Sequence, residues 1–318
     1  MYKVGIIGAA GYTGGELIRL LLHHPNVEIA YVHSNSQAGK PVSDTHDDLV
    51  GDTDLYFTDN LDLSVDVLFL CMGHGEAKKW LEQNPVPDEV LLIDLSHDFR
   101  WKENFTYGLP ELNKNQIQQS KRIANPGCFA TAIQLALLPL AKAQLLQDEV
   151  HIHAITGSTG AGQSLQATSH FSWRNGNISI YKAFEHQHLA EIGQSLKTLQ
   201  PDLLKALNFI PVRGDFTRGI FASLYTNCDL DIKKLNDLYH DFYQDAPFTK
   251  VTKQNPHLKQ VVNTNKCVLY VEKHGDKVFI ISAIDNLLKG ASGQAVENMN
   301  LALGLDTCAG LRLKANAF

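Results

Sequence analysis

A glycine-rich turn near the N-terminus constrains the fold more than any other segment of this chain. An apolar strand is predicted over residues 4–8, and the turn that follows it reads Gly8-Ala9-Ala10-Gly11-Tyr12-Thr13-Gly14. Leu17, Leu20 and Leu21 then recur at helical spacing, which predicts a helix over residues 14–24. A strand, a glycine-rich turn and a helix in this order direct backbone N–H groups and the positive end of a helix dipole at a diphosphate. The pattern favours a dinucleotide site over the alternative, in which the glycines serve tight packing alone.

Strands and helices continue to alternate through the first third of the chain. Apolar runs predict strands over residues 27–33, 65–71 and 90–94, and a helix is predicted over residues 76–83. The run at residues 65–71 is apolar almost throughout, as expected of a strand buried on both faces of a parallel sheet. Short connections between alternating strands and helices predict a Rossmann-like, doubly wound α/β sheet.

The pattern changes after about residue 125. A long helix is predicted over residues 129–146 and a final amphipathic helix over residues 291–304. Between them, predicted strands at residues 267–273 and 277–283 flank His274-Gly275-Asp276, which indicates a tight hairpin. The later strands therefore predict an α+β domain with a mixed or antiparallel sheet.

The charge balance and the apolar content exclude several classes of protein. The chain carries 28 Lys and Arg against 34 Asp and Glu, a net charge of −6, whereas dedicated nucleic-acid binders are basic. Its longest apolar stretch, residues 130–146, contains Pro139 and Lys142 and is too short for a membrane span. The chain begins almost directly with a strand pattern, so we expect no secretory leader, and its five cysteines form no CxxC pair. We therefore expect a cytoplasmic protein with no zinc site and no membrane or nucleic-acid partner.

The end of the second predicted strand indicates which dinucleotide binds. An NAD site usually places Asp or Glu there to bind the ribose 2′-hydroxyl. Here the segment reads His33-Ser34-Asn35-Ser36-Gln37 and contains no carboxylate. Ser34, Ser36 and Lys40 are able to donate hydrogen bonds to a 2′-phosphate, which favours NADP. The alternative is that these are ordinary solvated loop residues.

Cys128 is the candidate nucleophile. It follows Asn125-Pro126-Gly127, where a turn joins a strand to the long helix, and it falls at the N-terminus of that helix. A helix N-terminus favours the thiolate form of a cysteine. The remaining cysteines are interpreted as packed, inert side chains: Cys71, Cys228, Cys267 and Cys308. The alternative for Cys128 is a packed residue of the same kind.

The candidate acid–base group lies in the segment His186-Gln187-His188-Leu189-Ala190-Glu191, which is predicted to open a helix that ends near residue 198. A thiolate nucleophile requires a nearby acid–base, and histidine titrates in the right range. His188 and Glu191 are three residues apart on one helix face, where the carboxylate is able to orient the imidazole. The alternative is a pair of exposed histidines on a polar helix face.

Two further segments are candidates for binding anions. The loop Gly157-Ser158-Thr159-Gly160-Ala161-Gly162 follows a predicted strand over residues 150–156 and offers backbone donors to a phosphate or to the nicotinamide ribose. Its alternative is a flexible turn. Arg213 and Arg218 stand ahead of another strand, where an arginine suits a carboxylate or a phosphate, although structural arginines are equally common there.

Together these motifs resemble the family of N-acetyl-gamma-glutamyl-phosphate reductases, and the resemblance extends over essentially the whole chain. The matching segments occur in the family's order: GAAGYTGGEL at 8–17, DLSHDFR at 94–100, YGLPEL at 107–112, NPGC at 125–128, TGSTGAG at 156–162, HQHLAE at 186–191, TRGI at 217–220 and DNLLKGASGQAVENMN at 285–300.

The resemblance implies roles for individual residues. It implies Cys128 as the nucleophile and His188 as the acid–base, with His186 as the alternative and Glu191 beside them. Substrate-binding roles are expected for Arg218, Arg100 and Ser158. Cofactor-binding roles are expected for Gly8, Ala10, Gly11, Tyr12, Thr13, Gly14, Ser34, Ser36, Gly73, Gly160 and Asn286.

The resemblance also implies an architecture and a reaction. We expect an NADP-binding Rossmann domain over residues 1–127, a catalytic and dimerisation domain over residues 128–289, and a C-terminal helix at about 290–318 that packs back on the first domain. The implied reaction is the NADPH-dependent, metal-free reduction of N-acetyl-L-glutamyl 5-phosphate through a cysteine thioester, by a homodimer or homotetramer.

Three alternatives to this function stay open. One is an enzyme similar to aspartate-semialdehyde dehydrogenase, and another is an NADP sensor without catalysis. The third is the same reaction on a different N-acyl-glutamyl phosphate. It arises because Ala130 and Ala190 stand where the family usually has proline, and Gln163 where it has a basic residue.

Overall fold

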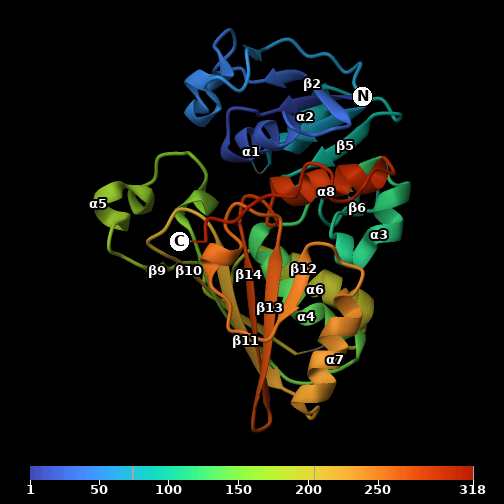
Figure 1. Cartoon of the computed structure of the whole chain (residues 1–318), viewed down its shortest axis with the longest axis vertical. Helices are drawn as coiled ribbons and strands as arrows, with labels where there is room; N and C mark the ends of the chain where they lie inside the picture. Colours follow the sequence, from blue (N-terminus) through green and yellow to red (C-terminus); the bar gives the residue numbers. More distant parts are fainter. Residues whose placement is uncertain (74, 204, 318) are drawn as a thin grey trace. The chain divides into compact units, whose positions relative to one another are not determined.

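The computed structural model describes residues 1–73, 75–203 and 205–317, and its helices and strands are shown in Figure 1. The chain divides into two compact units. The first unit contains Met1–Gly127 and Ala291–Arg312, and the second contains Cys128–Gly290 and Leu313–Phe318.

A parallel sheet forms the centre of the first unit. Its strands are β1 (Tyr2–Ile7), β2 (Val27–His33), β3 (Phe57–Thr58), β4 (Val67–Leu70), β5 (Leu91–Asp94), β6 (Thr106–Tyr107) and β7 (Arg122–Ala124), in the order β3-β2-β1-β4-β5-β7-β6. All these neighbours pair in parallel, and every residue of β4 is buried, as its apolar sequence predicts. The predicted Rossmann-like architecture is confirmed.

Among its described residues, the first unit has four helices: α1 (Tyr12–Leu21), α2 (Glu76–Gln83), α3 (Pro110–Gln119) and α8 (Ser292–Ala302). Leu17, Leu20 and Leu21 of α1 are buried, as predicted. The helix α8 contacts α1, α3 and β5 of the same unit, although it comes from the other end of the chain. Two short 3₁₀ turns, Val42–Asp44 and Asp47–Leu49, complete this unit.

The prediction for the C-terminal segment was wrong in two respects. The helix is shorter than residues 290–318, and it is not amphipathic, because Ser292–Leu301 are all buried. Its polar side chains are used inside the unit, where the Asn298 amide donates to the backbone oxygen of Gly108 (2.8 Å) and to Asn125 Oδ1 (3.0 Å). The tail groups with the second unit, where the Ala317 N–H donates to the carbonyl of Lys259 (3.1 Å).

The second unit contains a mixed sheet, as predicted. Its strands are β8 (Val150–Thr156), β9 (Ser179–Ile180), β10 (Leu207–Arg213), β11 (Ile220–Asn227), β12 (Thr249–Thr252), β13 (Cys267–His274) and β14 (Lys277–Ile284), in the order β12-β13-β14-β11-β8-β10-β9. The strands β13 and β14 form the predicted antiparallel hairpin. The pairs β8–β10 and β12–β13 are parallel.

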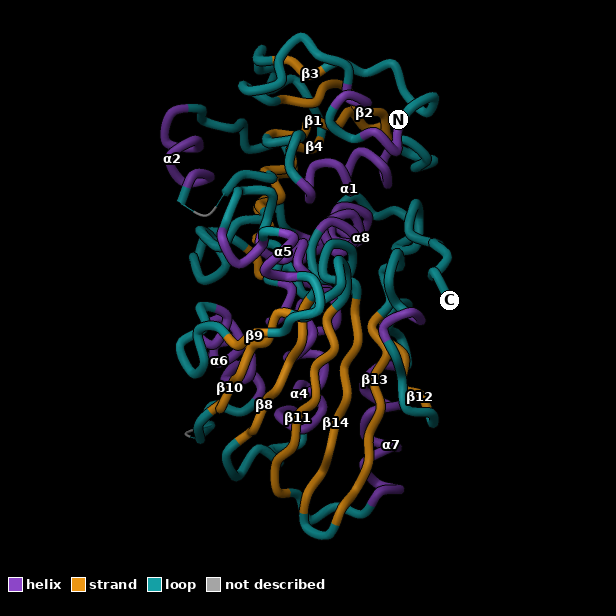
Figure 2. The backbone as a smooth tube through the Cα atoms, turned by 90° about the vertical axis from the view of Figure 1, so that its left-hand side faces the viewer, coloured by secondary structure: helices purple, strands orange, loops and turns teal. Residues whose placement is uncertain are grey.

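The longer helices of the second unit cover one face of this sheet. They are α4 (Cys128–Lys142), α6 (His188–Leu199) and α7 (Ile232–Tyr243), and Figure 2 shows them on one side, behind the strands. The short helix α5 (Phe171–Arg174) and the 3₁₀ turns Ser158–Ala161, Ala167–Ser169 and Leu258–Gln260 lie in connections. None of the helices in the described ranges combines the length and apolar character that a membrane crossing requires.

The boundaries of α4 and α6 differ from the predictions for local reasons. The helix α4 ends at Lys142 and not at residue 146, because Gln144 adopts a left-handed backbone (φ 59°). The helix α6 begins at His188 and not at His186. His186 instead lies before the helix, and its Nδ1 accepts the backbone N–H of His188 (3.2 Å).

Candidate active site

The glycine-rich turn of the first unit has the geometry of a phosphate-binding turn. Gly8 has a φ of +78°, and a side chain on it would lie 2.8 Å from the carbonyl oxygen of Cys71. A side chain on Gly14 would lie 2.6 Å from the backbone of Ala9, so the turn closes tightly on α1. At the start of α1, Gly11 supplies no side-chain cap and the first turn has no acidic residue. Nothing in this turn opposes an anion at the helix N-terminus.

Neighbouring strand ends bring the predicted cofactor residues of the first unit to one edge of the sheet. Ile7 pairs with His33 on one side and with Leu70 on the other, so the connections after β1, β2 and β4 start side by side. These connections contain Ala10, Ser34, Ser36 and the exposed Gly73, and the connection after β1 leads directly into Tyr12 and Thr13 at the start of α1. Ligands of parallel α/β sheets bind at such an edge.

The segment after β2 holds the polar side chains that the sequence singled out. Ser34 is buried, and its hydroxyl oxygen lies 3.4 Å from that of Ser36. Lys40 donates to the side chain of Gln37 (3.1 Å). The residues of this edge therefore fit a dinucleotide, and those after β2 bring no carboxylate toward a 2′-phosphate.

The DLSHDFR segment contains polar contacts that the sequence analysis did not anticipate. Asp94 is fully buried and accepts a hydrogen bond from the Ser96 hydroxyl (2.7 Å), and burial raises the pKa of Asp94 to about 6. Asp98 accepts the N–H groups of Gly75 (2.7 Å) and Lys78 (3.1 Å) and so fixes the start of α2. An Asp one strand away from a helix start gives no local signal in the sequence.

Arg100, a predicted substrate ligand, is almost completely buried in the first unit. Its Nε donates to the carbonyl of Asn125 (2.9 Å), and its Nη2 donates to the carbonyl of Leu95 (3.3 Å). Asn125 is also held by its own amide, which donates to the carbonyl of Ala291 (3.0 Å). These contacts anchor the chain three residues before Cys128, so they give Arg100 a role in shaping this turn.

Cys128 is the first residue of α4 and is half-buried. It packs against Gly290, where an added side chain would lie 2.8 Å from Cys128 Cβ. Tyr181 is also within electrostatic reach. Burial raises the pKa of the Tyr181 hydroxyl, and a negative charge on Cys128 raises it further, whereas Arg213 lowers it. The guanidinium of Arg213 stacks on the Tyr181 ring, 4.8 Å from its centroid.

The two histidines are buried and occupy different environments. His186 and His188 are 5% and 6% exposed, so the alternative of exposed histidines on a polar face is wrong. Burial, and then the charge of Lys182, lower the pKa of His186 to about 4. Its Nδ1 already accepts the N–H that begins α6, so His186 is neutral near pH 7 and caps the helix. His188 is the first residue of α6, one turn before the buried Glu191.

Aromatic rings connect these histidines to the helix of Cys128. The ring of Phe129 lies 5.5 Å from that of His186 and 6.4 Å from that of His188, measured between centroids. Tyr181 and Phe209 also contact His186, at 5.8 Å and 5.4 Å. Edge-to-face packing of this kind fixes the orientation of both imidazoles beside the start of α4.

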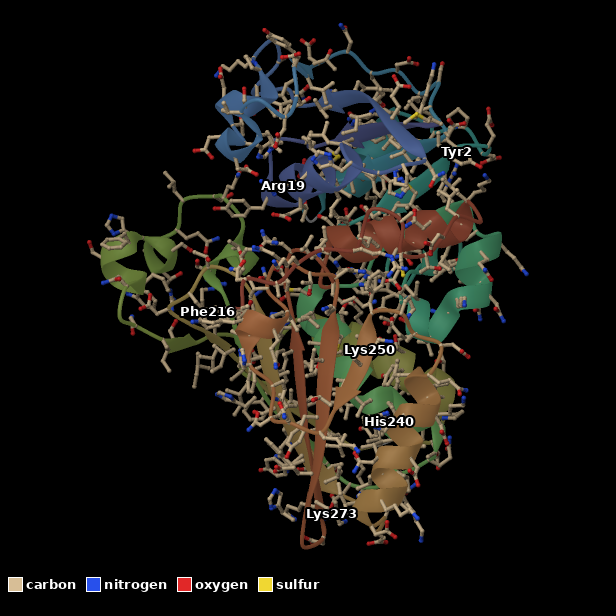
Figure 3. The ribbon with its side chains drawn as sticks, viewed as in Figure 1. Tyr2, Arg19, Phe216, His240, Lys250 and Lys273 are labelled. Atoms are coloured by element: carbon tan, nitrogen blue, oxygen red, sulfur yellow. The ribbon has the colours of Figure 1, made fainter. Side chains whose placement is uncertain are left out.

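Three connections of the second unit are hydrogen-bonded to one another. The 3₁₀ turn that contains Ser158 and Gly160 is paired with the β10–β11 connection, since the Ser158 N–H donates to the carbonyl of Phe216 (2.8 Å). Phe216 is labelled in Figure 3. Asn286 joins the third connection to both, because its amide donates to Thr159 Oγ1 (3.0 Å) and accepts from the Gly219 N–H (2.7 Å). The segment at residues 157–162 is therefore built into this cluster and is not an independent flexible turn.

Arg218 lies in the same cluster and forms a two-point ion pair. Its Nε and Nη2 donate to the two oxygens of Asp285 (3.0 and 3.2 Å). The Arg218 side chain is 20% exposed, whereas that of Asp285 is fully buried. Asp285 is a further residue of this cluster, and it directly precedes the predicted Asn286 in the sequence.

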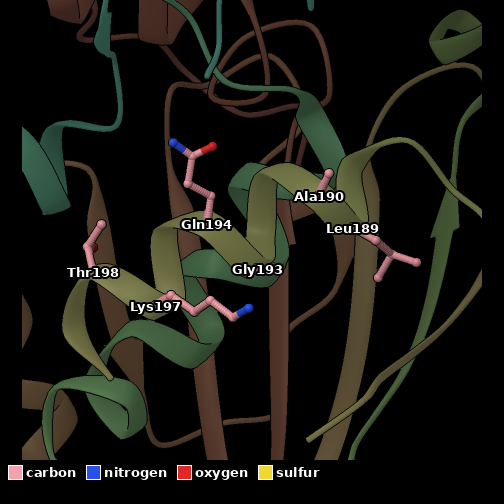
Figure 4. Close-up of a pocket in the computed structure, with 6 residues that line it drawn as sticks. All are labelled: Leu189, Ala190, Gly193, Gln194, Lys197 and Thr198. Atoms are coloured by element: carbon pink, nitrogen blue, oxygen red, sulfur yellow. The ribbon is translucent and has the colours of Figure 1, made fainter. Parts of the chain in front are cut away.

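The structure thus gathers the predicted site residues into two groups. The first unit contains the glycine turn, Ser34, Ser36, Gly73 and Arg100, and the second contains the remaining residues: Cys128, Ser158, Gly160, His186, His188, Glu191, Arg218 and Asn286. A separate shallow hollow on the outer side of α6, shown in Figure 4, contains none of them. Its lining is Leu189, Ala190, Gly193, Gln194, Lys197 and Thr198.

Comparison with known families gives two matches that cover most of the chain. Residues 3–120 match the family described as "Semialdehyde dehydrogenase, NAD binding domain". Residues 128–286 match "Semialdehyde dehydrogenase, dimerisation domain".

Among curated proteins, the chain is 61% identical to the N-acetyl-gamma-glutamyl-phosphate reductase of Azobacteroides pseudotrichonymphae and 57% identical to that of Parabacteroides distasonis, with 100% of both chains covered in each case. Among solved structures, it is similar in fold to aspartate semialdehyde dehydrogenase II from Vibrio cholerae. That match has a TM-score of 0.75 at 16% identity and covers 96% of this chain and 98% of the other.

Proposed function

The chain belongs to the family of N-acetyl-gamma-glutamyl-phosphate reductases, and we propose that it reduces N-acetyl-L-glutamyl 5-phosphate to N-acetyl-L-glutamate 5-semialdehyde in arginine biosynthesis. It is an oxidoreductase of the semialdehyde dehydrogenase type. The observation that carries the proposal is the full-length similarity together with a half-buried cysteine at a helix N-terminus, whose helix packs against a buried histidine pair.

Cys128 supplies the nucleophile. Its thiolate attacks the acyl carbon, the carbon–oxygen bond to phosphate breaks, and inorganic phosphate leaves with the electron pair, so a thioester remains on the protein. When bound, reduced NADP supplies the hydride that reduces the thioester carbonyl. Backbone N–H groups at the start of α4 favour the oxyanion that forms on that carbonyl in both steps.

His188 is the acid–base group of this proposal. It holds the proton that the oxyanion requires after reduction, and it takes that proton back when the carbon–sulfur bond breaks and the semialdehyde leaves. Three features favour His188 over His186. His186 is neutral near pH 7, its Nδ1 is occupied by a backbone N–H, and it has no carboxylate one turn onward. His188 has the buried Glu191 at that spacing.

We assign NADP contacts to residues of each unit. In the first unit, the diphosphate would be held by the glycine turn, namely Gly8, Ala10, Gly11, Tyr12, Thr13 and Gly14. Ser34 and Ser36 would bind the 2′-phosphate, and Gly73 would contact the cofactor from the connection after β4. In the second unit, Gly160 and Asn286 would contact the nicotinamide half. The Asn286 amide group has two hydrogens to donate. One hydrogen bond goes to Thr159 Oγ1, and the second hydrogen would bind the carboxamide oxygen of the nicotinamide.

For the substrate, Arg218 supplies a fixed guanidinium and Ser158 a hydroxyl in the same cluster, where both suit a carboxylate or a phosphate. Arg100 acts on the substrate site through the chain before Cys128. An N-acyl group other than acetyl is the second candidate, and it rests on Ala130, Gln163 and Ala190, which differ from the family pattern.

We further propose that the enzyme is a cytoplasmic homodimer or homotetramer that associates through the second unit. The cysteines are scattered along the sequence and form no CxxC pair, in keeping with a reducing compartment. The sheet face without helices presents Phe221, Tyr225, Tyr270 and Phe279, which are half-buried or exposed. An uncovered face of this kind suits a second copy of the chain.

An arm at residues 163–184 extends the surface available for association. Six of its large apolar side chains are exposed, namely Leu165, Phe171, Trp173, Ile178, Ile180 and Phe184. Arg174 holds the arm in shape by donating to the carbonyls of Asn177 (3.1 Å) and Arg213 (2.8 Å). If each of the six side chains buries roughly 100 Å² on association, together they approach the ~800 Å² of surface that one partner buries in a standard interface.

One coupled assay tests the proposed function. Purified protein is mixed with N-acetylglutamyl phosphate or aspartyl phosphate, and cofactor oxidation and phosphate release are followed together. We expect one phosphate per cofactor oxidised with the acetylglutamyl substrate only. Turnover of aspartyl phosphate alone would replace this proposal by an enzyme similar to aspartate-semialdehyde dehydrogenase. Binding of NADPH without turnover of either substrate would replace it by an NADP sensor without catalysis.

Light scattering on the same preparation tests self-association. The variant is Phe171→Asp, and Val50→Asp, at an exposed position, is its control.

A further inference from the structure

The six-residue turn Asp285–Gly290, which follows β14, is organised around one buried carboxylate. The Oδ1 of Asp285 accepts the N–H groups of Leu287 (2.8 Å) and Leu288 (3.2 Å), and its Oδ2 accepts the N–H of Asn263 (2.8 Å). The Gly290 N–H closes the turn on the backbone oxygen of Asp285 (2.9 Å). The Asp285 side chain is fully buried, so its position is determined by the protein and not by solvent.

The same carboxylate fixes the arginine that the proposed mechanism assigns to the substrate. Both Asp285 oxygens accept from Arg218, one from Nε and the other from Nη2. A two-point contact with a planar guanidinium sets the plane of that group as well as its position. Arginine carries considerable rotamer freedom, and a guanidinium that is already oriented loses less of it when an anion binds.

The other end of the turn lies against the nucleophile. A side chain on Gly290 would lie 2.8 Å from Cys128 Cβ and 2.6 Å from the carbonyl oxygen of Asn286. The second contact is with backbone, so the strain is not relieved by rotating a side chain. The absence of a side chain at Gly290 therefore allows Cys128 to occupy its position at the start of α4.

We infer that the Asp285–Gly290 turn positions two parts of the active site at once, with Asp285 orienting Arg218 toward the substrate anion and Gly290 setting the place of Cys128. This inference rests on the proposed function for the role of Arg218. Neither Asp285 nor Gly290 touches the reacting atoms, so both are positioning residues. Their effects are separable, because one concerns substrate binding and the other the reactivity of the thiol.

Asp285→Asn tests the first half. The amide keeps one oxygen but places an N–H group against one donor of Arg218 and against the backbone N–H groups that share that position. We expect the KM for the acyl phosphate to rise about 10–100-fold, on the scale of a lost charge-assisted hydrogen bond. The KM for NADPH and the rate of Cys128 alkylation by iodoacetamide should stay within about twofold of wild type. Asp276→Asn, in the exposed β13–β14 hairpin, is the matched control.

A double variant separates positioning from a general loss of structure. In an Arg218→Ala background, Asp285→Asn should change the KM by less than about twofold, because the group that it orients is gone. Effects that multiply would overturn the inference for Asp285. Arg218→Lys, which keeps the charge but has no fork, should reproduce the KM rise and replaces Asp285→Asn if that variant does not fold.

Gly290→Ala tests the second half. We expect kcat and the alkylation rate of Cys128 to fall together by about 10–100-fold, the scale of a 1 Å displacement of a reacting group, while the KM for the acyl phosphate stays within about twofold. Gly193→Ala is the control, because an added side chain there meets nothing within 4 Å. An unchanged alkylation rate in a folded Gly290→Ala protein would overturn this half. Alkylation needs no substrate, so this result does not depend on the proposed reaction.

Discussion

The two units of the molecule hold their own candidate binding residues in different ways. The first unit presents mainly backbone N–H groups and hydroxyls, from a glycine turn and from Ser34 and Ser36. The second unit presents ionisable side chains, and several of these are held by other side chains, as Arg218 is by Asp285. A backbone site is formed wherever the local fold forms, whereas a side-chain site depends on partners that are remote in sequence. The variants below should therefore separate cofactor binding from covalent chemistry.

The largest expected effect is the loss of the nucleophile. Cys128→Ala should lower kcat by at least about 10⁴-fold, because the covalent step has no substitute. The dissociation constant for NADPH, measured by fluorescence titration, should stay within about twofold. Residual turnover within tenfold of wild type would remove Cys128 from the mechanism.

The histidines sharpen the comparison inside the second unit. His188→Asn should lower kcat by about 10²–10⁴-fold, the usual contribution of a general acid–base group. His186→Asn should cost about tenfold or less, because an Asn at this position is still able to accept the N–H that begins α6. Single-turnover rates compare the two variants directly, and a larger loss in His186→Asn would reverse the assignment.

Cofactor choice tests the first unit alone. We expect kcat/KM to favour NADPH over NADH by at least about tenfold, the effect of one good charge-assisted hydrogen bond to the 2′-phosphate. A Ser34→Ala, Ser36→Ala double variant should reduce that preference and leave Cys128 alkylation unchanged. Preference for NADH in the wild type would show that the segment after β2 has been misinterpreted.

The smallest effect concerns stability. The pKa of folded His186 is about 4, below its unfolded value of 6.5, so between these values the unfolded chain binds the extra proton. Stability is therefore lost as the pH falls from 6.5 toward 4. In wild type, His186 should contribute a loss of about 1 kcal/mol between pH 7 and pH 5.5, and His186→Asn should lack it. Urea unfolding of both proteins at the two pH values measures the difference, and parallel losses would contradict the burial argument.

The contrast between local and remote contacts also explains which features could be predicted from the sequence. The boundaries of α2 and the pairing of β13 with β14 were predicted correctly, because helical periodicity and a tight turn are local signals. The turn at Gly8–Gly14 was recognisable for the same reason. Asp285 was not identified, because its partner Arg218 lies 67 residues away and only the folded sheet brings them together.

The C-terminal helix shows a second limit of sequence interpretation. Its polar residues predicted a solvent-exposed face, but Asn298 and Asn300 bind backbone carbonyls inside the first unit. Burial of a polar side chain depends on partners that periodicity does not specify. Similarly, His186 is packed against Phe129, Tyr181 and Phe209, which come from three separate segments of the chain.

The central claim is that the second unit performs the covalent step with its own residues, and acylation without any cofactor tests it most directly. Protein freed of nucleotide is mixed with N-acetylglutamyl phosphate, quenched in acid and digested, and the peptide that contains Cys128 is weighed by mass spectrometry. The account predicts an acetylglutamyl thioester on Cys128, with about one phosphate released per acylated chain, and no adduct in Cys128→Ala. An adduct on another residue, or an unmodified Cys128 in protein that turns the substrate over when NADPH is added, would contradict it.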